Sequence, residues 1–236
     1  MNIGLLIAGG VGQRMGQEIP KQFININDKP VIIYTLEAFQ NHPDIDAIAV
    51  VCLDGWHHVL DVYAKQFNIT KLKYIVSGGD NGQASIRNGV YELEKHFSPD
   101  DIVLIHDAIR PMVSQEIISD CIRVTKEKGN AITVIPCAEA MLVSESQTDS
   151  TEIYNRDHLK RTQTPQAFYI KDICDLHREA IEKGILNSVA SCTLMVELGK
   201  EVYFSKGSEK NVKLTTVEDL DIFKALLTLK RSEWLR

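Results

Sequence analysis

Short apolar runs recur along the chain at intervals that a helix would fill. The runs are nearly continuous in apolarity, as strands buried on both faces of a sheet require. Amphipathic stretches over about 30–41, 82–96 and 114–128 lie between them, with Pro30 placed for the first turn of a helix. Strands that alternate with helices predict an α/β, Rossmann-like fold, with a mostly parallel sheet covered on both faces. The predicted strands are residues 3–7, 47–51, 74–76, 102–105 and 131–135.

The rhythm changes after Pro136. Residues 138–144 and 152–155 resemble two strands joined by a polar, turn-rich segment, which predicts a protruding β-hairpin arm over about 137–158. An isolated hairpin is marginal in water, so the arm is expected to pack on a second copy of the chain. Beyond the arm, the pattern predicts helices over about 171–183 and 188–198, a strand over 201–204 and a last helix capped by Thr216.

Composition narrows the class of protein. With 236 residues, of which 44% are hydrophobic, the chain can bury one generous core, so we expect a single domain over 1–236. A net charge of -6 argues against a partner such as nucleic acid or an acidic membrane. The sequence shows neither a signal-peptide pattern nor an apolar run that could span a bilayer, and its five scattered cysteines form no CxxC pair. These features predict a reduced, cytoplasmic protein.

The first predicted strand ends in a glycine-rich turn. Glycines allow main-chain N–H groups to approach an anion closely, which suits a phosphate chain. The turn lacks the Gly-Lys-Ser/Thr of a Walker A loop, and Met15 stands where a dinucleotide fingerprint needs its third glycine. What remains is GGxGxR with Lys21 seven residues after Arg14, a pair of cations that favours a triphosphate. The alternative is a simple strand-to-helix turn with surface cations. The turn comprises Ala8, Gly9, Gly10, Val11, Gly12, Gln13, Arg14, Met15 and Gly16.

Polar motifs also follow the third and fourth predicted strands. Gly78-Gly79-Asp80 closes one strand and Ser85 opens the next helix, while His106-Asp107 and Arg110 follow the other. Carboxyl ends of parallel strands are where α/β sheets bind ligands. Taken alone, however, these residues could equally be a turn and two helix caps.

Together these motifs resemble the cytidylyltransferase family that includes the methylerythritol-phosphate (IspD) and ribitol-5-phosphate (TarI) cytidylyltransferases. The resemblance covers essentially the whole chain and implies a glycosyltransferase-A-like nucleotidyltransferase fold, a homodimer joined by the arm, and Mg²⁺-dependent transfer of CMP from CTP to a polyol phosphate with release of pyrophosphate. It is carried by residues 8–23, 78–80, Ser85, 106–111, 155–157, 163–166 and 211–216.

The resemblance also implies roles for individual residues. Catalytic charges are assigned to Arg14, Lys21, Arg156 and Lys213, with Arg156 reaching into the neighbouring subunit. The nucleotide is expected to contact Ala8, Gly9, Gly10, Gly12, Gly79, Asp80 and Ser85. The acceptor is expected to contact Asp107, Arg110, Arg156, Thr164 and Lys213, and Asp107 is the candidate metal contact, mainly through CTP phosphates and water.

Two departures from the methylerythritol-phosphate pattern fall on the acceptor side. Ala140 stands where those enzymes carry a threonine, and residues 187–191 replace a Thr-Asp pair. Because unpaired polar groups discriminate strongly between substrates, these changes favour a different acceptor, an alditol phosphate such as ribitol 5-phosphate used for wall or capsule polymers. Methylerythritol 4-phosphate, for isoprenoid precursors, stays the alternative. Two functions of other classes stay open as alternatives, an NAD(P)-dependent oxidoreductase and a non-catalytic nucleotide sensor.

Overall fold

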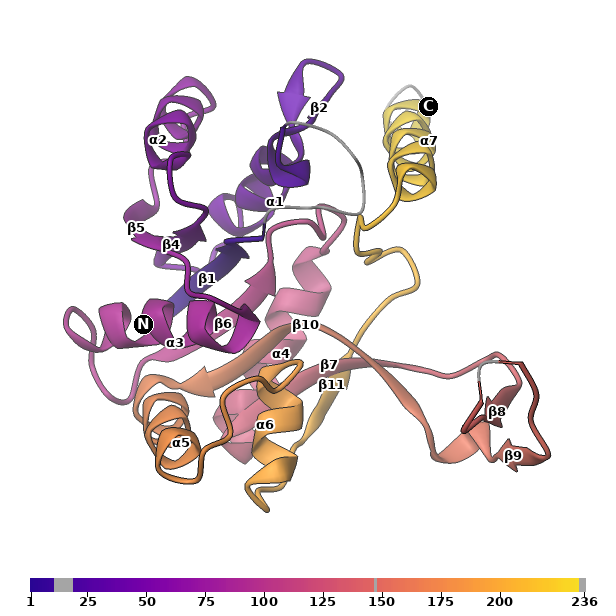
Figure 1. Ribbon diagram of the computed structural model, residues 1–236. Helices are drawn as coiled ribbons and strands as arrows, with labels where there is room; N and C mark the ends of the chain where they lie inside the picture. Colours follow the sequence, from indigo (N-terminus) through magenta and orange to yellow (C-terminus); the bar gives the residue numbers. More distant parts are fainter. Residues whose placement is uncertain (11–18, 147, 234–236) are drawn as a thin grey trace.

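A seven-stranded sheet forms the centre of the computed structural model, which describes residues 1–10, 19–146 and 148–233 (Figure 1). Its strand order is β11-β7-β10-β6-β1-β4-β5, and β10 runs antiparallel to both of its neighbours. The sheet is therefore mostly parallel, as predicted. The strands are β1 (Asn2–Ala8), β4 (Ala47–Cys52), β5 (Leu72–Ser77), β6 (Ile102–Asp107), β7 (Asn130–Pro136), β10 (Lys160–Tyr169) and β11 (Phe204–Lys206).

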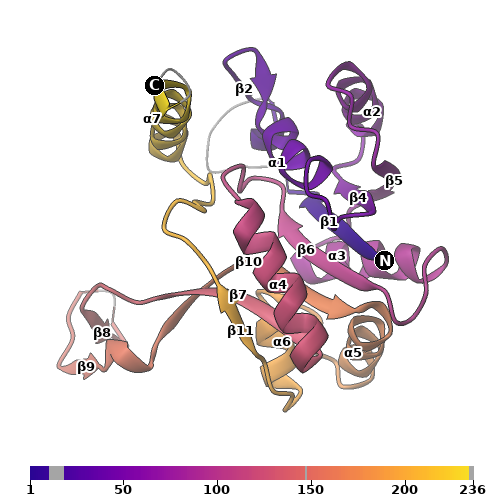
Figure 2. The ribbon, with the colours of Figure 1, turned by 180° about the vertical axis from the view of Figure 1, so that it is seen from behind.

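Helices cover both faces of this sheet. On one face lie α1 (Val31–Gln40), α2 (His57–Gln66) and α4 (Gln115–Lys128), the last of which stands in front of the sheet in Figure 2. On the other lie α3 (Gly82–Glu94), α5 (Ile170–Glu182) and α6 (Ser191–Glu197), of which α5 and α6 stand in front in Figure 1.

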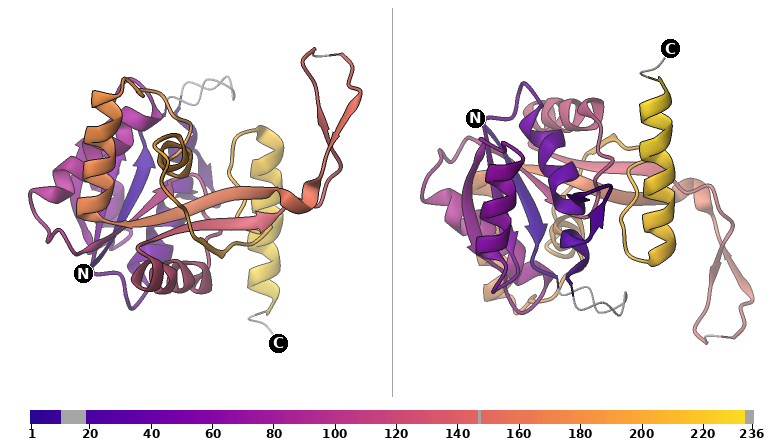
Figure 3. Two further views of the ribbon diagram at one scale, coloured as in Figure 1. Left: turned by 90° about the horizontal axis from the view of Figure 1, so that it is seen from below. Right: turned by 90° about the horizontal axis from the view of Figure 1, so that it is seen from above.

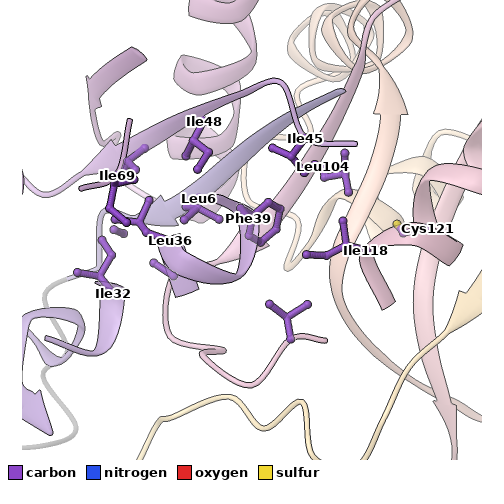
Figure 4. Close-up of a cluster of buried hydrophobic side chains, with 14 of the residues drawn as sticks. Leu6, Ile32, Leu36, Phe39, Ile45, Ile48, Ile69, Leu104, Ile118 and Cys121 are labelled. Atoms are coloured by element: carbon purple, nitrogen blue, oxygen red, sulfur yellow. The ribbon is translucent and has the colours of Figure 1, made fainter. Parts of the chain in front are cut away.

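Alternation along each strand explains why there are two cores. Successive side chains of a strand point to opposite faces, so Leu6 joins the cluster under α1, α2 and α4, whereas Leu5 joins the cluster under α3, α5 and α6. Figure 4 shows the first cluster, where Leu6 lies among Leu36, Phe39 and Ile48. Burial of strands on both faces accounts for the nearly continuous apolar runs of the sequence.

Some elements differ from the sequence-based expectation. The strand β10 was not predicted, because its sequence is largely polar and carries Pro165, features that normally argue against a central strand. We also did not predict α2 or the short pair β2 (Asn25–Ile26) and β3 (Lys29–Pro30). The last sheet strand begins at Phe204 rather than at residue 201. Pro30 precedes α1 as its N-cap instead of occupying the first turn.

Two segments project from the body of the protein (Figure 3). One is the arm, whose tip pairs β8 (Met141–Val143) antiparallel with β9 (Glu152–Tyr154), so the predicted hairpin is present. The other is α7 (Val217–Glu233), which begins after Thr216 as expected and packs through Phe223 on Tyr34 of α1. In the described part of the chain, no helix has the length and apolarity needed to cross a membrane.

Candidate active site

A cavity of about 700 Å³ opens at the carboxyl ends of the parallel strands. The strand register explains how distant motifs meet there, because Ile7 of β1 lies beside Asp107 of β6 and Ala8 lies beside Cys52 of β4. The main-chain N–H of Gly78 donates to the carbonyl of Cys52 (3.0 Å), which brings the end of β5 to the same edge. The lining residues are 7–10, 21–22, 53, 79–82, 85–86, 105–107, 109–110, 162–164, 166, 189–191 and 213.

One part of the cavity wall is formed mainly by main-chain groups and small residues. We call this part, residues 8–10, 79–82 and 85, the glycine wall. Gly79 donates its N–H to the hydroxyl of Ser85 (3.0 Å). A Cβ atom on Gly79 would lie 2.6 Å from the Cβ of Ala84, so only glycine fits this turn. Ser85 itself is buried and holds the turn from inside.

Gln22 supports the glycine wall from behind. Its side-chain amide donates to the carbonyls of Ala8 (2.8 Å) and Gly10 (3.1 Å), and the side chain is buried. Sequence reasoning gave this residue no role. The available signal was its position next to Lys21, which lines the cavity as expected. Arg14 and Gly12, both predicted for this part of the site, lie outside the described residues.

A second part of the cavity wall, formed by the turn after β6 and by residue 213, carries charge. The Asp107 carboxylate accepts a hydrogen bond from Arg110 Nε (2.9 Å) through Oδ2 and one from Lys213 Nζ (3.1 Å) through Oδ1. Burial alone would raise the pKa of Asp107, but the charges of Lys213 and Arg110 outweigh burial and lower it. Asp107 is therefore ionised at neutral pH and holds both cations at one place. We call these three residues the charged cluster.

Two further cavity-lining residues, Thr164 and His106, form hydrogen bonds with main-chain groups of the charged cluster. The main-chain N–H of Asp107 donates to the hydroxyl of Thr164 (3.0 Å), which in turn lies 3.0 Å from Nδ1 of His106. The other ring nitrogen of His106 lies 3.2 Å from the carbonyl of Arg110. Burial of the ring, which packs against Phe39, lowers the pKa of His106 to about 4.

Asn211 connects the segment that carries Lys213 to Arg110 and Thr164. Its carbonyl accepts from Arg110 Nη1 (2.8 Å), and its buried side-chain amide donates to the carbonyl of Thr164 (2.8 Å). Two residues later the chain reaches Lys213. The sequence gave no reason to single out Asn211 beyond its place in the 211–216 motif, because its partners come from segments about 50 and 100 residues away.

Two acceptor-side positions named from sequence lie elsewhere. Arg156 and Ala140 belong to the arm and do not line this chain's cavity. The exposed Arg156 contacts the carbonyl of Ala138 within the arm. By contrast, residues 189–191, the segment that departs from the Thr-Asp pattern, do line the cavity.

The cavity offers no ready-made metal cage. Among residues 1–10, 19–146 and 148–233, no group of three or more His, Cys, Asp or Glu side chains is placed to bind a metal ion. Both carboxylate oxygens of Asp107 already accept hydrogen bonds from cations. This donor set suits Mg²⁺ only where the ligands are substrate phosphate oxygens and water, an arrangement that Mg²⁺ commonly adopts.

Comparisons with known proteins agree with this geometry. The sequence profile of the IspD family, described as 2-C-methyl-D-erythritol 4-phosphate cytidylyltransferase, matches residues 3–229. A ribitol-5-phosphate cytidylyltransferase of Lacticaseibacillus paracasei is 45% identical over 98% of this chain and 99% of that protein. Proteins of the same name from Vibrio parahaemolyticus and Streptococcus agalactiae are 40% and 38% identical, over 96% and 99% of this chain and 96% and 98% of those proteins.

Solved structures show the same fold. The 4-diphosphocytidyl-2C-methyl-D-erythritol synthase of Anaerococcus prevotii superposes with a TM-score of 0.81 at 23% identity, covering 96% of each chain. The 2-C-methyl-D-erythritol 4-phosphate cytidylyltransferase of Francisella tularensis superposes with a TM-score of 0.76 at 24% identity, over 94% of this chain and 98% of that one. The chain is therefore a nucleotidyltransferase that belongs to the IspD family of cytidylyltransferases.

Proposed function

We propose that this enzyme transfers CMP from CTP to an alditol phosphate, with D-ribitol 5-phosphate as the acceptor and CDP-ribitol and pyrophosphate as products. The observation that carries the proposal is a cavity lined by both the glycine wall and the charged cluster. The relatives named ribitol-5-phosphate cytidylyltransferase support the choice of acceptor, since they are 38–45% identical over nearly the whole chain.

In the proposed reaction, an oxygen of the acceptor phosphate attacks the α-phosphorus of CTP. A new phosphorus–oxygen bond forms, the bond to the β-phosphate bridge breaks, and pyrophosphate leaves with the electron pair. The attacking oxygen is already anionic, so no general base is needed. Catalysis then depends on holding the two substrates in line and on stabilising the negative charge that grows on the oxygens of the α-phosphate and the leaving group.

The glycine wall is proposed to bind CTP. Main-chain groups of Ala8, Gly9, Gly10 and Gly79, with Asp80 and Ser85, would contact the nucleotide, together with Gly12 outside the described residues. Lys21 and Arg14 would neutralise the triphosphate and the developing charge. When bound, Mg²⁺ would screen the phosphate charges, held by CTP phosphate oxygens and water, with Asp107 in contact only through water.

The charged cluster is proposed to bind the acceptor. Arg110 and Lys213 are cations available to an alditol hydroxyl or phosphate, and Asp107 can accept from a hydroxyl. Arg156 lies outside this chain's own cavity, which supports a dimer in which the arm delivers it to the partner's site. The exposed apolar side chains of the arm, Leu142 (64% exposed) and Ile153 (81%), also favour coverage by a second copy.

The cytoplasm is the proposed compartment. All five cysteines are unpaired and buried, as expected of a protein that works under reducing conditions.

A pyrophosphate-release assay tests the proposal. The enzyme is mixed with CTP and Mg²⁺ and offered ribitol 5-phosphate, methylerythritol 4-phosphate or glycerol 3-phosphate in separate reactions. Ribitol 5-phosphate is expected to give the highest kcat/KM. A higher value for methylerythritol 4-phosphate would assign the acceptor named by the family profile instead. CTP binding without pyrophosphate release from any acceptor would indicate a nucleotide sensor.

A further inference from the structure

A hydrogen-bond chain links the turn of the charged cluster to β10, and both of its side chains, His106 and Thr164, are among the residues that line the cavity. Its members are the main-chain N–H of Asp107, the hydroxyl of Thr164, both ring nitrogens of His106 and the carbonyl of Arg110. The chain begins and ends on the turn that carries Asp107 and Arg110, and the turn itself is closed by the Arg110 N–H donating to the Asp107 carbonyl (3.0 Å).

The partners fix the direction of each hydrogen bond. A carbonyl can only accept, so Nε2 of His106 must carry a hydrogen that it donates to Arg110. The ring is fully buried, and among the described residues it forms no hydrogen bond with a carboxylate, so we infer that it carries one proton and that Nδ1 keeps a lone pair. Nδ1 therefore accepts from the Thr164 hydroxyl, whose oxygen accepts from Asp107.

This direction has a consequence for Thr164. A hydroxyl has one hydrogen, and here it points toward His106 rather than into the cavity. Thr164 is thus unable to donate to an acceptor hydroxyl while this bond persists. Its threonine oxygen instead anchors the main chain of Asp107, whose carboxylate in turn holds Arg110 and Lys213.

We propose that His106 and Thr164 are a pair of positioning residues. They fix the positions of Asp107 and Arg110 and thereby determine the affinity of the charged cluster for the polyol phosphate acceptor. This inference rests on the proposed function, since it takes the charged cluster as the acceptor site. The His106 side chain is fully buried, so its proposed action is through Asp107 and Arg110 and not through contact with a substrate.

Kinetics of Thr164 variants test the role. Thr164→Val keeps the shape and removes the hydroxyl, whereas Thr164→Ser keeps the hydroxyl. Loss of one hydrogen bond that orients a charged group is expected to raise the KM for ribitol 5-phosphate about tenfold in Thr164→Val, with the KM for CTP changed less than about twofold. Thr164→Ser should restore most of the loss. An unchanged acceptor KM in Thr164→Val, or equal rises for both substrates, would overturn the proposal.

A double-mutant cycle tests the pairing. His106→Asn places an amide oxygen near the position of Nδ1 and can still accept from Thr164, whereas His106→Leu cannot. If the two residues act as one unit, Thr164→Val combined with His106→Leu should cost no more than the larger single effect. Additive losses would mean that the residues act independently, against the proposal. Thermal unfolding of each variant identifies losses that come from misfolding.

The imidazole can also be observed directly, without any turnover. In long-range ¹H–¹⁵N spectra of ¹⁵N-histidine-labelled enzyme, His106 is identified as the signal absent from His106→Asn. We expect a neutral ring with hydrogen on Nε2, and a shift of the Nδ1 signal in Thr164→Val. Hydrogen on Nδ1 would overturn the inference. Failure of the wild type to use any acceptor would instead overturn the proposed function, and the two failures are thereby distinguished.

Discussion

The glycine wall and the charged cluster consist of different kinds of chemical groups. The glycine wall consists of main-chain groups fixed by local turns and by two buried side chains, Gln22 and Ser85. The charged cluster consists of charged side chains from segments that lie about 100 residues apart in the sequence. These side chains form hydrogen bonds with one another. A main-chain site therefore requires positions without side chains, whereas clustered charges require counter-ions within the protein.

The largest expected effect is at Lys21, the cavity-lining neighbour of Gln22. Lys21→Ala removes the ammonium proposed to stabilise the transferring phosphate, and kcat should fall about 10³-fold, the scale seen when one electrostatic donor is lost. The melting temperature should change little. The control is Lys126→Ala on the exposed face of α4. A parallel loss of folding in Lys21→Ala would show that the residue is structural.

Gly79→Ala tests whether the glycine wall depends on the absence of a side chain. The new Cβ would lie within 2.8 Å of main-chain and side-chain atoms of Ala84, so the turn must shift. Overpacking of this kind costs about 2 kcal/mol, and if binding of CTP has to restore the original turn, the same cost raises the KM for CTP roughly 30-fold. Gly82→Ala is the matched control, because a Cβ there meets nothing within 4 Å. Equal KM values for the two variants would contradict the argument.

Arg156→Ala should affect the acceptor site alone. Loss of the arm's guanidinium is expected to raise the KM for ribitol 5-phosphate about tenfold and leave the KM for CTP unchanged. Mixing this variant with Lys21→Ala should recover activity, because a mixed dimer then contains one site with both residues intact. Steady-state assays of mixed and unmixed enzymes provide the measurement. Absence of recovery after subunit exchange would argue against a shared site.

The smallest expected effect concerns a buried histidine away from the cavity and its influence on stability at low pH. His177 on α5 is buried, and burial followed by the charge of Arg87 lowers its pKa to about 4. The unfolded chain, with an ordinary histidine pKa near 6.5, binds a proton more readily, so stability is complete above pH 6.5 and declines as the pH falls toward 4. His177→Leu should therefore lose about 1 kcal/mol less stability than wild type between pH 7 and pH 5.5.

Urea unfolding at the two pH values measures this difference, with His58→Leu on the exposed side of α2 as the control. Identical pH dependence in wild type and His177→Leu would show that the buried ring does not govern acid stability. Activity of His177→Leu at neutral pH should match wild type, since the residue lies away from the cavity lining.

Local patterns in the sequence predict the alternation of strands and helices, the hairpin, and the motifs at the strand ends. They do so because both-face burial leaves continuous apolar runs and because turns and helix caps depend on adjacent residues. The strand register then explains why motifs 70 to 100 residues apart share one edge of the sheet.

The other features depend on contacts between distant parts of the chain. The strand β10 is stabilised by its two neighbours in the sheet, β7 and β6. Its polar residues Gln163 and Gln166 form hydrogen bonds with distant residues, and no local sequence pattern predicts these partners. The roles of Gln22, Asn211 and His106 likewise arise from contacts with distant main-chain groups. Long-range hydrogen bonds leave no periodic trace in a sequence, and for that reason the residues that orient the charged cluster emerged only from the folded chain.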